Sequence, residues 1–406
     1  MTDSWQGPVP AGDALARCVG DVDRFVAHAW GRRSFLHART GDDTFADLLS
    51  IDDVDRILTA TSPRRPAIRV VRDGREVPAA AYTRSGTLGS RTLTDLPDVG
   101  RLLALFDEGA TIVLQGLQRT WPAVGRLCRG IESYLTHPVQ ANAYLTPPGS
   151  QGLKVHHDTH DVLALQTYGR KRWVTYAPLI DHPLPGQRVR VDPEALGPPV
   201  IDTERRPGDC LYVPRGTLHA AATTGDASLH LTIGVRVVTW HDVARRVVDR
   251  TRDVGAFREA LPVGFARRPE HLRDELPARL KQLADLIVDS DADMVADREA
   301  ERFWSGLLLR PDGAVRMRLA DVAADAVVAP RDDLPFRIAV TNGRLRVRRG
   351  GTELAMPAWV EPAVRALLTA PVRLDALPGG LDVESACVLV RRLVREGMVV
   401  VRPAAP

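Results

Sequence analysis

Three side chains that commonly bind metals stand at two places in the sequence. His156 and Asp158 are two residues apart and precede an apolar run, 162–168, whose composition predicts a β-strand. In an extended strand, residues i and i+2 point to the same face, so the imidazole and the carboxylate would project side by side. His219 ends a turn–strand–turn segment that begins at Pro207. Two histidines and one carboxylate on one face of a metal, with the opposite positions open, form the ligand set of non-haem iron(II) oxygenases.

The pair alone is weak evidence, because a His-x-Asp sequence is common by chance and most strand histidines are polar surface residues. A lysine strengthens the metal-site interpretation. Of 54 Lys+Arg residues, only Lys154, Lys171 and Lys281 are lysines. Lys171 stands on a predicted inward-facing strand, where a compact ammonium group would suit a dicarboxylate co-substrate. The alternative is a surface lysine in the basic turn 170–172.

Several motifs occur together and in one order. They are 142–152 (Asn-Ala-Tyr-Leu-Thr-Pro-Pro-Gly-Ser-Gln-Gly), His156-His-Asp158, 165–166 (Leu-Gln), 169–173 (Gly-Arg-Lys-Arg-Trp) and 214–219 (Pro-Arg-Gly-Thr-Leu-His). This series closely resembles the JmjC-type ribosomal oxygenases, Fe(II)- and 2-oxoglutarate-dependent protein hydroxylases of the cupin superfamily. The resemblance covers the catalytic core and, in outline, the whole chain. It implies an α+β fold: a double-stranded β-helix with N-terminal helices, a helical dimerisation region and a C-terminal winged helix.

The resemblance also implies roles for individual residues. The Fe(II) ligands would be His156, Asp158 and His219, whereas His157 would point away from the metal. Lys171 would pair with the distal carboxylate of 2-oxoglutarate. Hydrogen bonds to the co-substrate or pocket are expected from Asn142, Thr146 and Thr232. The substrate pocket is expected to contain Tyr144, His160 and His230.

The stretch 228–238 alternates cleanly between apolar and polar residues. Its apolar positions are Leu229, Leu231, Ile233, Val235 and Val237. The other face carries Ser228, His230 and Thr232, and it either lines a partly polar pocket or faces solvent as a polar edge.

Composition limits the classes of protein that fit. The net charge is only +3, so no polybasic character indicates nucleic acid. The four cysteines (Cys18, Cys128, Cys210 and Cys387) lack the Cys-x-x-Cys spacing of zinc modules, and their separation fits a reducing cytosol. No apolar run reads as a signal peptide or reaches the ~20 residues of a membrane helix. We therefore expect a cytoplasmic protein that contacts no membrane.

Changes in periodicity divide the chain into four expected domains. Residues 1–100 would elaborate the barrel, with helices in 13–60 and Ser50 as an N-cap. Residues 101–238 would form the catalytic domain, with short strands from 153 onward. Residues 239–312 would be helical, including 270–288 and 293–309, with an apolar stripe that packs either on a second copy or on the barrel.

Residues 330–406 would form the winged helix, with a hairpin turn at Asn342-Gly343, helices at 359–368 and 383–395, and a strand at 398–402. Some winged helices bind DNA. Residues 331–406 contain 12 Arg and 8 Asp+Glu, a net charge of only +4, so nucleic acid is not the expected partner.

Four functions fit this pattern to different degrees. The favoured one is hydroxylation of an arginine or histidine side chain in a ribosomal protein. The same chemistry on a biosynthetic peptide or small molecule is the first alternative. The second alternative is a non-enzymatic barrel with a nucleic-acid-binding winged helix, but it gives no role to the metal triad or to Lys171. The third alternative is a zinc- or manganese-dependent isomerase of the cupin type, which gives no role to Lys171.

Overall fold

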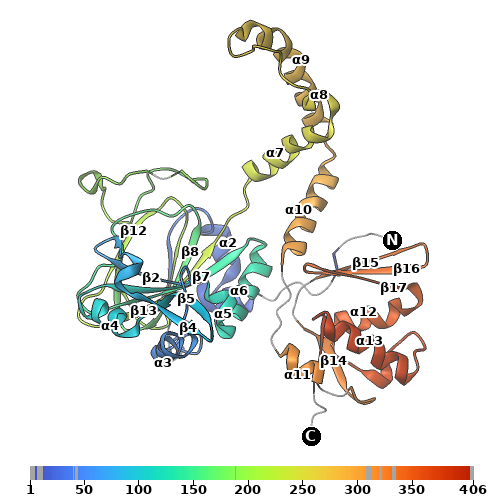
Figure 1. Cartoon of the computed structure of the whole chain (residues 1–406), viewed down its shortest axis with the longest axis horizontal. Coiled ribbons are helices and arrows are strands. Elements are labelled where there is room, and N and C mark those ends of the chain that lie inside the picture. The colour runs from blue at the N-terminus through green and yellow to red at the C-terminus, as the bar shows by residue number, and fades with distance from the viewer. Residues whose placement is uncertain are drawn as a thin grey trace. The chain divides into compact units, whose positions relative to one another are not determined.

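The computed structural model describes residues 5–6, 12–39, 41, 44–187, 189–307, 313–319, 322–331 and 335–402. It divides into two compact units, Pro10–Val237 and a second formed by Met1–Val9 with Val238–Pro406 (Figure 1). The predicted helix end at residue 309 and the predicted domain boundary at 312 lie outside the described residues.

An eight-stranded antiparallel sheet is the frame of the unit Pro10–Val237. Its strand order is β1-β11-β8-β13-β7-β6-β2-β3. The strands are β1 (Phe35–His37), β2 (Ile68–Arg72), β3 (Arg75–Glu76), β6 (Thr111–Gln115), β7 (Val139–Thr146), β8 (Asp161–Tyr168), β11 (Cys210–Val213) and β13 (Ser228–Val235). A second sheet, β10-β9-β12, consists of β9 (Lys171–Tyr176), β10 (Ile201–Arg205) and β12 (Leu218–Ala222). A separate hairpin pairs β4 (Thr83–Leu88) with β5 (Arg91–Pro97).

The two faces of β13 meet different surroundings. Its apolar positions Leu229, Leu231, Ile233 and Val235 belong to the main core, to which the helices also contribute. The principal helices are α1 (Asp13–Val19), α2 (Val22–His28), α3 (Ile51–Arg56), α4 (Val99–Asp107) and α6 (Pro122–Leu135). Ser50 caps α3 through a capping box, as predicted. A smaller core that includes Val162, Leu211 and Trp173 joins the eight-stranded sheet to β9.

A tight turn connects β8 to β9 and sets which residues of β9 face inward. Gly169 has φ +63°, and a Cβ there would lie 1.8 Å from the carbonyl oxygen of Ala227. Only glycine fits without movement of the backbone. After this turn, Lys171, Trp173 and Thr175 are the buried residues of β9, because alternate residues share a face.

The second unit begins with helices and ends in a mixed α/β region. The helices are α7 (Trp240–Val248), α8 (Gly255–Arg258), α9 (Pro269–Val288), α10 (Ala292–Gly306), α11 (Ala314–Leu319), α12 (Glu361–Thr369) and α13 (Val383–Arg395). One sheet contains β15 (Phe336–Thr341), β16 (Arg344–Arg349) and β17 (Thr352–Pro357); the other contains β14 (Val327–Pro330), β18 (Val372–Arg373) and β19 (Val399–Arg402). The hairpin turn at Asn342-Gly343 is confirmed. Among the described helices, none has the length and apolar character needed to span a bilayer.

Candidate metal centre

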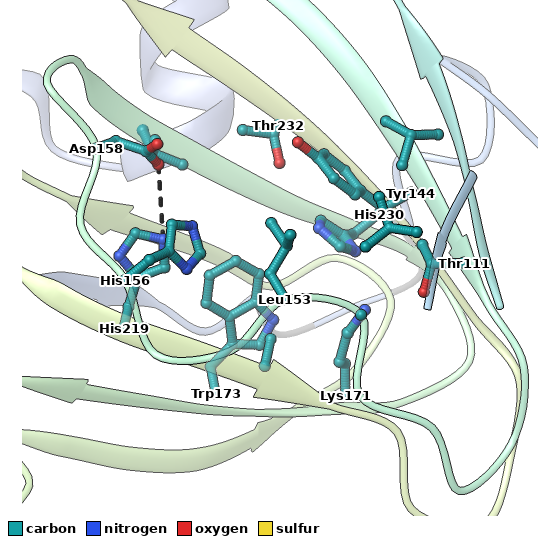
Figure 2. A pocket seen from close by; sticks show the side chains of 15 residues that line it. Thr111, Tyr144, Leu153, His156, Asp158, Lys171, Trp173, His219, His230 and Thr232 are labelled. Atoms are coloured by element: carbon teal, nitrogen blue, oxygen red, sulfur yellow. Dashed lines mark ion pairs between the residues drawn. The ribbon is translucent and has the colours of Figure 1, made fainter. Parts of the chain in front are cut away.

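His156, Asp158 and His219 lie together at one end of the cavity between the two sheets (Figure 2). One potential ligand atom from each lies within 4.8 Å of the others. The Nε2 atom of His219 is 3.6 Å from Oδ2 of Asp158, and the two imidazole centroids are 4.4 Å apart. The expected strand placement of His156 and Asp158 is wrong, because β8 begins only at Asp161. An isolated antiparallel bridge between His156 and His219 holds the loop instead.

Backbone carbonyls orient both imidazoles. Nδ1 of His156 is 2.8 Å from the carbonyl oxygen of Lys154, and Nδ1 of His219 is 3.0 Å from that of Thr217. Because a carbonyl oxygen only accepts hydrogen bonds, each Nδ1 carries the hydrogen and each Nε2 keeps its lone pair. A carbonyl on the second nitrogen is the usual way in which proteins fix a metal-binding histidine. The donor set therefore fits a divalent metal.

The electrostatics favour the forms of these groups that bind metals. Burial and, to a lesser extent, His156 lower the pKa of His219 to about 4, although Asp158 acts in the opposite direction. Burial by itself would raise the pKa of Asp158, but His219, His160, His156 and His157 lower it, and the net shift is downward. A neutral imidazole and an ionised carboxylate are the forms that coordinate a cation.

The cavity continues from the triad towards Lys171. Its apolar wall includes Val71, Val113, Leu153, Val162 and Trp173, and its polar wall includes Thr111, Tyr144, Lys171, His230 and Thr232. In Figure 2 the triad lies at the left of the cavity and Lys171 at the right, with Trp173 between them. A small ligand could therefore contact a metal at one end and an ammonium group at the other.

Lys171 is buried and hydrogen-bonded but has no acidic partner. Its side chain is 3% exposed, and Nζ donates to Oγ1 of Thr146 at 2.8 Å. Thr111 donates to the same Thr146 oxygen at 3.1 Å. Burial and, to a lesser extent, the charge of Arg205 together lower the pKa of Lys171 to about 7. Among the described residues, no carboxylate forms an ion pair with Lys171.

Three of the remaining predicted residues also border the cavity. Thr232 lies on its wall, and the rings of Tyr144 and His230 stack with centroids 5.0 Å apart. Burial lowers the pKa of His230 well below its usual value, and Lys171 and Arg205 add to this shift. His230 is therefore neutral in the folded protein at neutral pH.

Three residues of the expected motifs lie elsewhere. Asn142 is not part of the cavity wall, and its side-chain oxygen accepts a hydrogen bond from the Gly116 N–H at 3.1 Å. His160 is also outside the wall and packs on Gly234, where a Cβ would lie 2.7 Å from the imidazole. His157 does not join the triad, and its Nε2 accepts a hydrogen bond from the Val189 N–H.

Sequence reasoning missed Trp173, which lines the cavity, and Arg205, which contacts Trp173 from outside the cavity wall. Trp173 stacks against His219 with centroids 6.0 Å apart and an interplanar angle of 14°. The guanidinium carbon of Arg205 is 4.3 Å from the centroid of the Trp173 ring. Arg205 is fully buried although it stands in a polar stretch. Only its alternation with Thr203 and Ile201 on one face of β10 could have indicated an inward position.

Comparisons with known proteins agree with this geometry. Residues 114–243 match the family model described as "JmjC domain". The bifunctional lysine-specific demethylase and histidyl-hydroxylase NO66 of Culex quinquefasciatus is 29% identical over 79% of this chain and 51% of its own length. Ribosomal oxygenase 2 of Rattus norvegicus is 36% identical over 44% of this chain and 41% of its own length.

A solved structure shows the same fold. YcfD, a ribosomal oxygenase from Escherichia coli in complex with cobalt and 2-oxoglutarate, has a TM-score of 0.52 and 18% identity, covering 94% of this chain and 98% of its own. This confirms the predicted JmjC/cupin fold. The chain spans about half the length of the first curated relatives that it matches, between 46% and 56%.

Proposed function

We propose that this chain, which belongs to the JmjC-type ribosomal oxygenase family, is an Fe(II)- and 2-oxoglutarate-dependent hydroxylase of a protein side chain. The observation that carries the proposal is the convergence of His156, Asp158 and His219 at one end of a cavity. The same cavity contains the buried Lys171, with which no described carboxylate forms an ion pair. The overall reaction consumes 2-oxoglutarate, dioxygen and a C–H bond, and it yields succinate, carbon dioxide and the alcohol.

The triad would hold the iron through two Nε2 atoms and one carboxylate oxygen. When bound, the iron would supply the redox chemistry that couples co-substrate decarboxylation to hydroxylation. The protein's own contribution is orientation. The carbonyls of Lys154 and Thr217 fix both imidazoles, and the Trp173 ring supports His219 from one side. Three ligands leave open positions for co-substrate and oxygen.

Lys171 would bind the distal carboxylate of 2-oxoglutarate. Thr146 already accepts a hydrogen bond from its ammonium group, which directs Nζ within the cavity. A bound carboxylate would supply the counter-ion that no described residue provides. Thr232, which lines the cavity, is a further proposed hydrogen-bond donor. Asn142 is a weaker candidate, because its oxygen is engaged by Gly116.

The substrate is proposed to be an arginine or histidine side chain of a ribosomal protein. Support comes from relatives named as histidyl-hydroxylase and as ribosomal oxygenase. Tyr144 and His230 form an aromatic wall of the cavity and are the proposed contacts for the incoming side chain. His160 would act indirectly, through its effect on Asp158.

The assignments for the rest of the chain are proposals of the same kind. We infer four domains with the ranges 1–100, 101–238, 239–312 and 330–406. The helical region would form a homodimer, since α9 exposes large apolar side chains, including Leu280 and Val288. The last domain would be a winged helix that positions substrate. A cytoplasmic location is proposed because the four cysteines stand far apart in the sequence and show no Cys-x-x-Cys spacing.

The function is tested by incubating anaerobically purified protein with Fe(II), 2-oxoglutarate and ribosomal fractions, and then admitting oxygen. One ribosomal protein that gains the mass of one oxygen atom, together with succinate, would support the proposal and identify the substrate. Succinate without any mass gain would direct the search to peptides or small molecules. If iron is bound but no succinate forms, the enzymatic assignment fails.

A further inference from the structure

Two basic side chains oppose each other on the inner face of the smaller sheet. Arg205 of β10 and Lys171 of β9 are directly paired in the strand register. Cross-strand partners have Cβ atoms about 5 Å apart, and like charges in such a pair are destabilising. Lys171 is 3% exposed and Arg205 is 0% exposed, so water does not screen the repulsion.

The outer face of the same two strands is arranged in the opposite way. There Arg172 pairs with Asp202 and Arg170 pairs with Glu204. On the inner face, Arg205 donates from Nη1 to the carbonyl oxygen of Ala164, but its Nε and Nη2 have no hydrogen-bond partner. In the described part of the chain, no carboxylate forms an ion pair with Arg205. Among the described residues, the inner face of β9 and β10 therefore carries two cations with no carboxylate paired to either of them.

We propose that Lys171 and Arg205 act as a cation pair that draws one proton into the barrel together with the distal carboxylate of the co-substrate, so that co-substrate binding is coupled to pH. The inference rests on the proposed function, which supplies 2-oxoglutarate as the dicarboxylate. Arg205 does not border the cavity; it is a positioning residue that acts through Lys171.

The direction of the coupling follows from the charges around Lys171. The pKa of Arg205 is about 10, so its guanidinium is charged near neutral pH, whereas the pKa of Lys171 is about 7 in the empty site. Besides the triad His156, Asp158 and His219, which would hold the bound metal, the other titratable groups lining this cavity are His230, from β13, and Tyr144, from β7. Burial keeps these last two groups neutral, by lowering the pKa of His230 and raising that of Tyr144. A carboxylate beside Lys171 favours its protonated form, so binding above pH 7 must take up a proton.

The test measures protons directly and does not use turnover. Mn(II)-loaded protein is titrated anaerobically with 2-oxoglutarate in a calorimeter, at pH 8 in buffers of different ionisation enthalpy. With a pKa of about 7 in the empty site, the wild type should take up about 0.9 proton per 2-oxoglutarate, and only about 0.1 at pH 6. Its Kd should rise about eightfold from pH 7.5 to pH 8.5.

Variants distinguish the effect of Arg205 on proton uptake from the effects of neighbouring residues. Arg205→Leu removes the repulsion but leaves the burial of Lys171, so proton uptake at pH 8 should fall measurably below that of the wild type, whereas Arg205→Lys should retain the wild-type uptake. Arg206→Leu removes the adjacent, exposed arginine and should match the wild type. His230→Asn should also retain the uptake; loss there would assign the proton to the imidazole and overturn the proposal.

Other outcomes also decide the question. Uptake near zero in the wild type at pH 8 overturns the proposal even if Arg205→Leu does not fold. Unchanged uptake in folded Arg205→Leu overturns the role of Arg205. If the metal-loaded wild type binds no 2-oxoglutarate at any pH, the proposed function fails, and this inference fails with it.

Discussion

His156 and His219 hold each other in place through matching contacts. The N–H of each residue donates to the carbonyl oxygen of the other, at 3.1 Å and 2.8 Å. In each case Nδ1 contacts the carbonyl oxygen two residues earlier in the chain, at Lys154 or Thr217. The backbone therefore fixes both rings before a metal binds, which reduces the entropy that binding must overcome.

His219→Ala should abolish metal binding and turnover without unfolding the barrel. The strand β12 remains paired with β9 through its backbone, and the loss is one ligand of three. Metal content after dialysis against Mn(II), together with a thermal melt, checks this. His241→Ala, on the exposed side of α7, is the matched control and should bind metal normally. Normal metal content and activity in His219→Ala would remove His219 from the ligand set.

Lys171→Ala should weaken 2-oxoglutarate binding while leaving the metal site nearly intact. Hydrogen bonds to charged groups contribute about 1.5–3 kcal/mol, so the Kd for 2-oxoglutarate should rise by about 10- to 150-fold. Calorimetry of Mn(II)-loaded protein measures it. Lys281→Ala removes an exposed lysine that pairs with Asp285 and should leave the Kd unchanged. An unchanged Kd in Lys171→Ala would contradict the assigned role.

Gly169→Ala should destabilise the protein far more than Gly89→Ala. Both glycines have positive φ, +63° and +57°, so both substitutions introduce similar backbone strain, about 1 kcal/mol. At Gly169 the new Cβ would also meet the carbonyl oxygen of Ala227, whereas nothing lies within 4 Å at Gly89. The difference in melting temperature isolates the clash. Equal melting temperatures would show that the turn before Lys171 is not constrained as described.

His230→Asn should make the metal-free protein less sensitive to acid. The folded-state pKa of His230 lies well below 6.5, so below pH 6.5 the unfolded chain takes up a proton that the folded chain does not. Stability is therefore lost as the pH falls below 6.5, at a rate for this residue of at most about 1.4 kcal/mol per pH unit. Urea unfolding at both pH values measures the slope. His28→Asn, exposed on α2, is the control; the same slope in His230→Asn and wild type would contradict the assignment.

Leu280→Glu should convert the proposed dimer to a monomer. Leu280 is 54% exposed on α9, where Leu276, Ile287 and Val288 are also exposed, and a carboxylate would be costly in an apolar interface. Light scattering coupled to gel filtration measures the mass. Gln282→Glu makes the same charge change at another exposed position of α9 and should remain dimeric. A monomeric wild type would remove the dimer from the account.

The metal ligands could be predicted from the sequence more completely than the residues around them. His156, Asp158 and His219 stand in motifs that can be read from spacing and residue type, and the structure brings them together. Their placement in a loop could not be read, because the bridge that holds His156 depends on a partner distant in the chain. The turn at Asn342-Gly343 and the helix at 383–395 were predictable because their signals are local.

The burial of Arg205 could not be predicted from the residues next to it in the sequence. An arginine in a polar segment ordinarily faces solvent, and its neighbour Arg206 does. Arg205 is buried because the register of β10 against β9 places it opposite Lys171 and beside Trp173. Asn142 illustrates the same limit, since its side chain bonds to Gly116 at the start of another element. The position of each of these side chains depends on contacts with segments that are distant in the sequence.

Oxygen isotope incorporation tests the central claim most directly. The Fe(II)-loaded protein, 2-oxoglutarate and the ribosomal substrate are mixed without oxygen, and ¹⁸O₂ is then admitted. An oxygenase that splits dioxygen between its two products should place one ¹⁸O atom in the hydroxylated protein and one in succinate, and His219→Ala should place none in either. Succinate and protein both free of ¹⁸O, from wild-type protein with iron bound, would contradict the assignment of this triad as an oxygenase site.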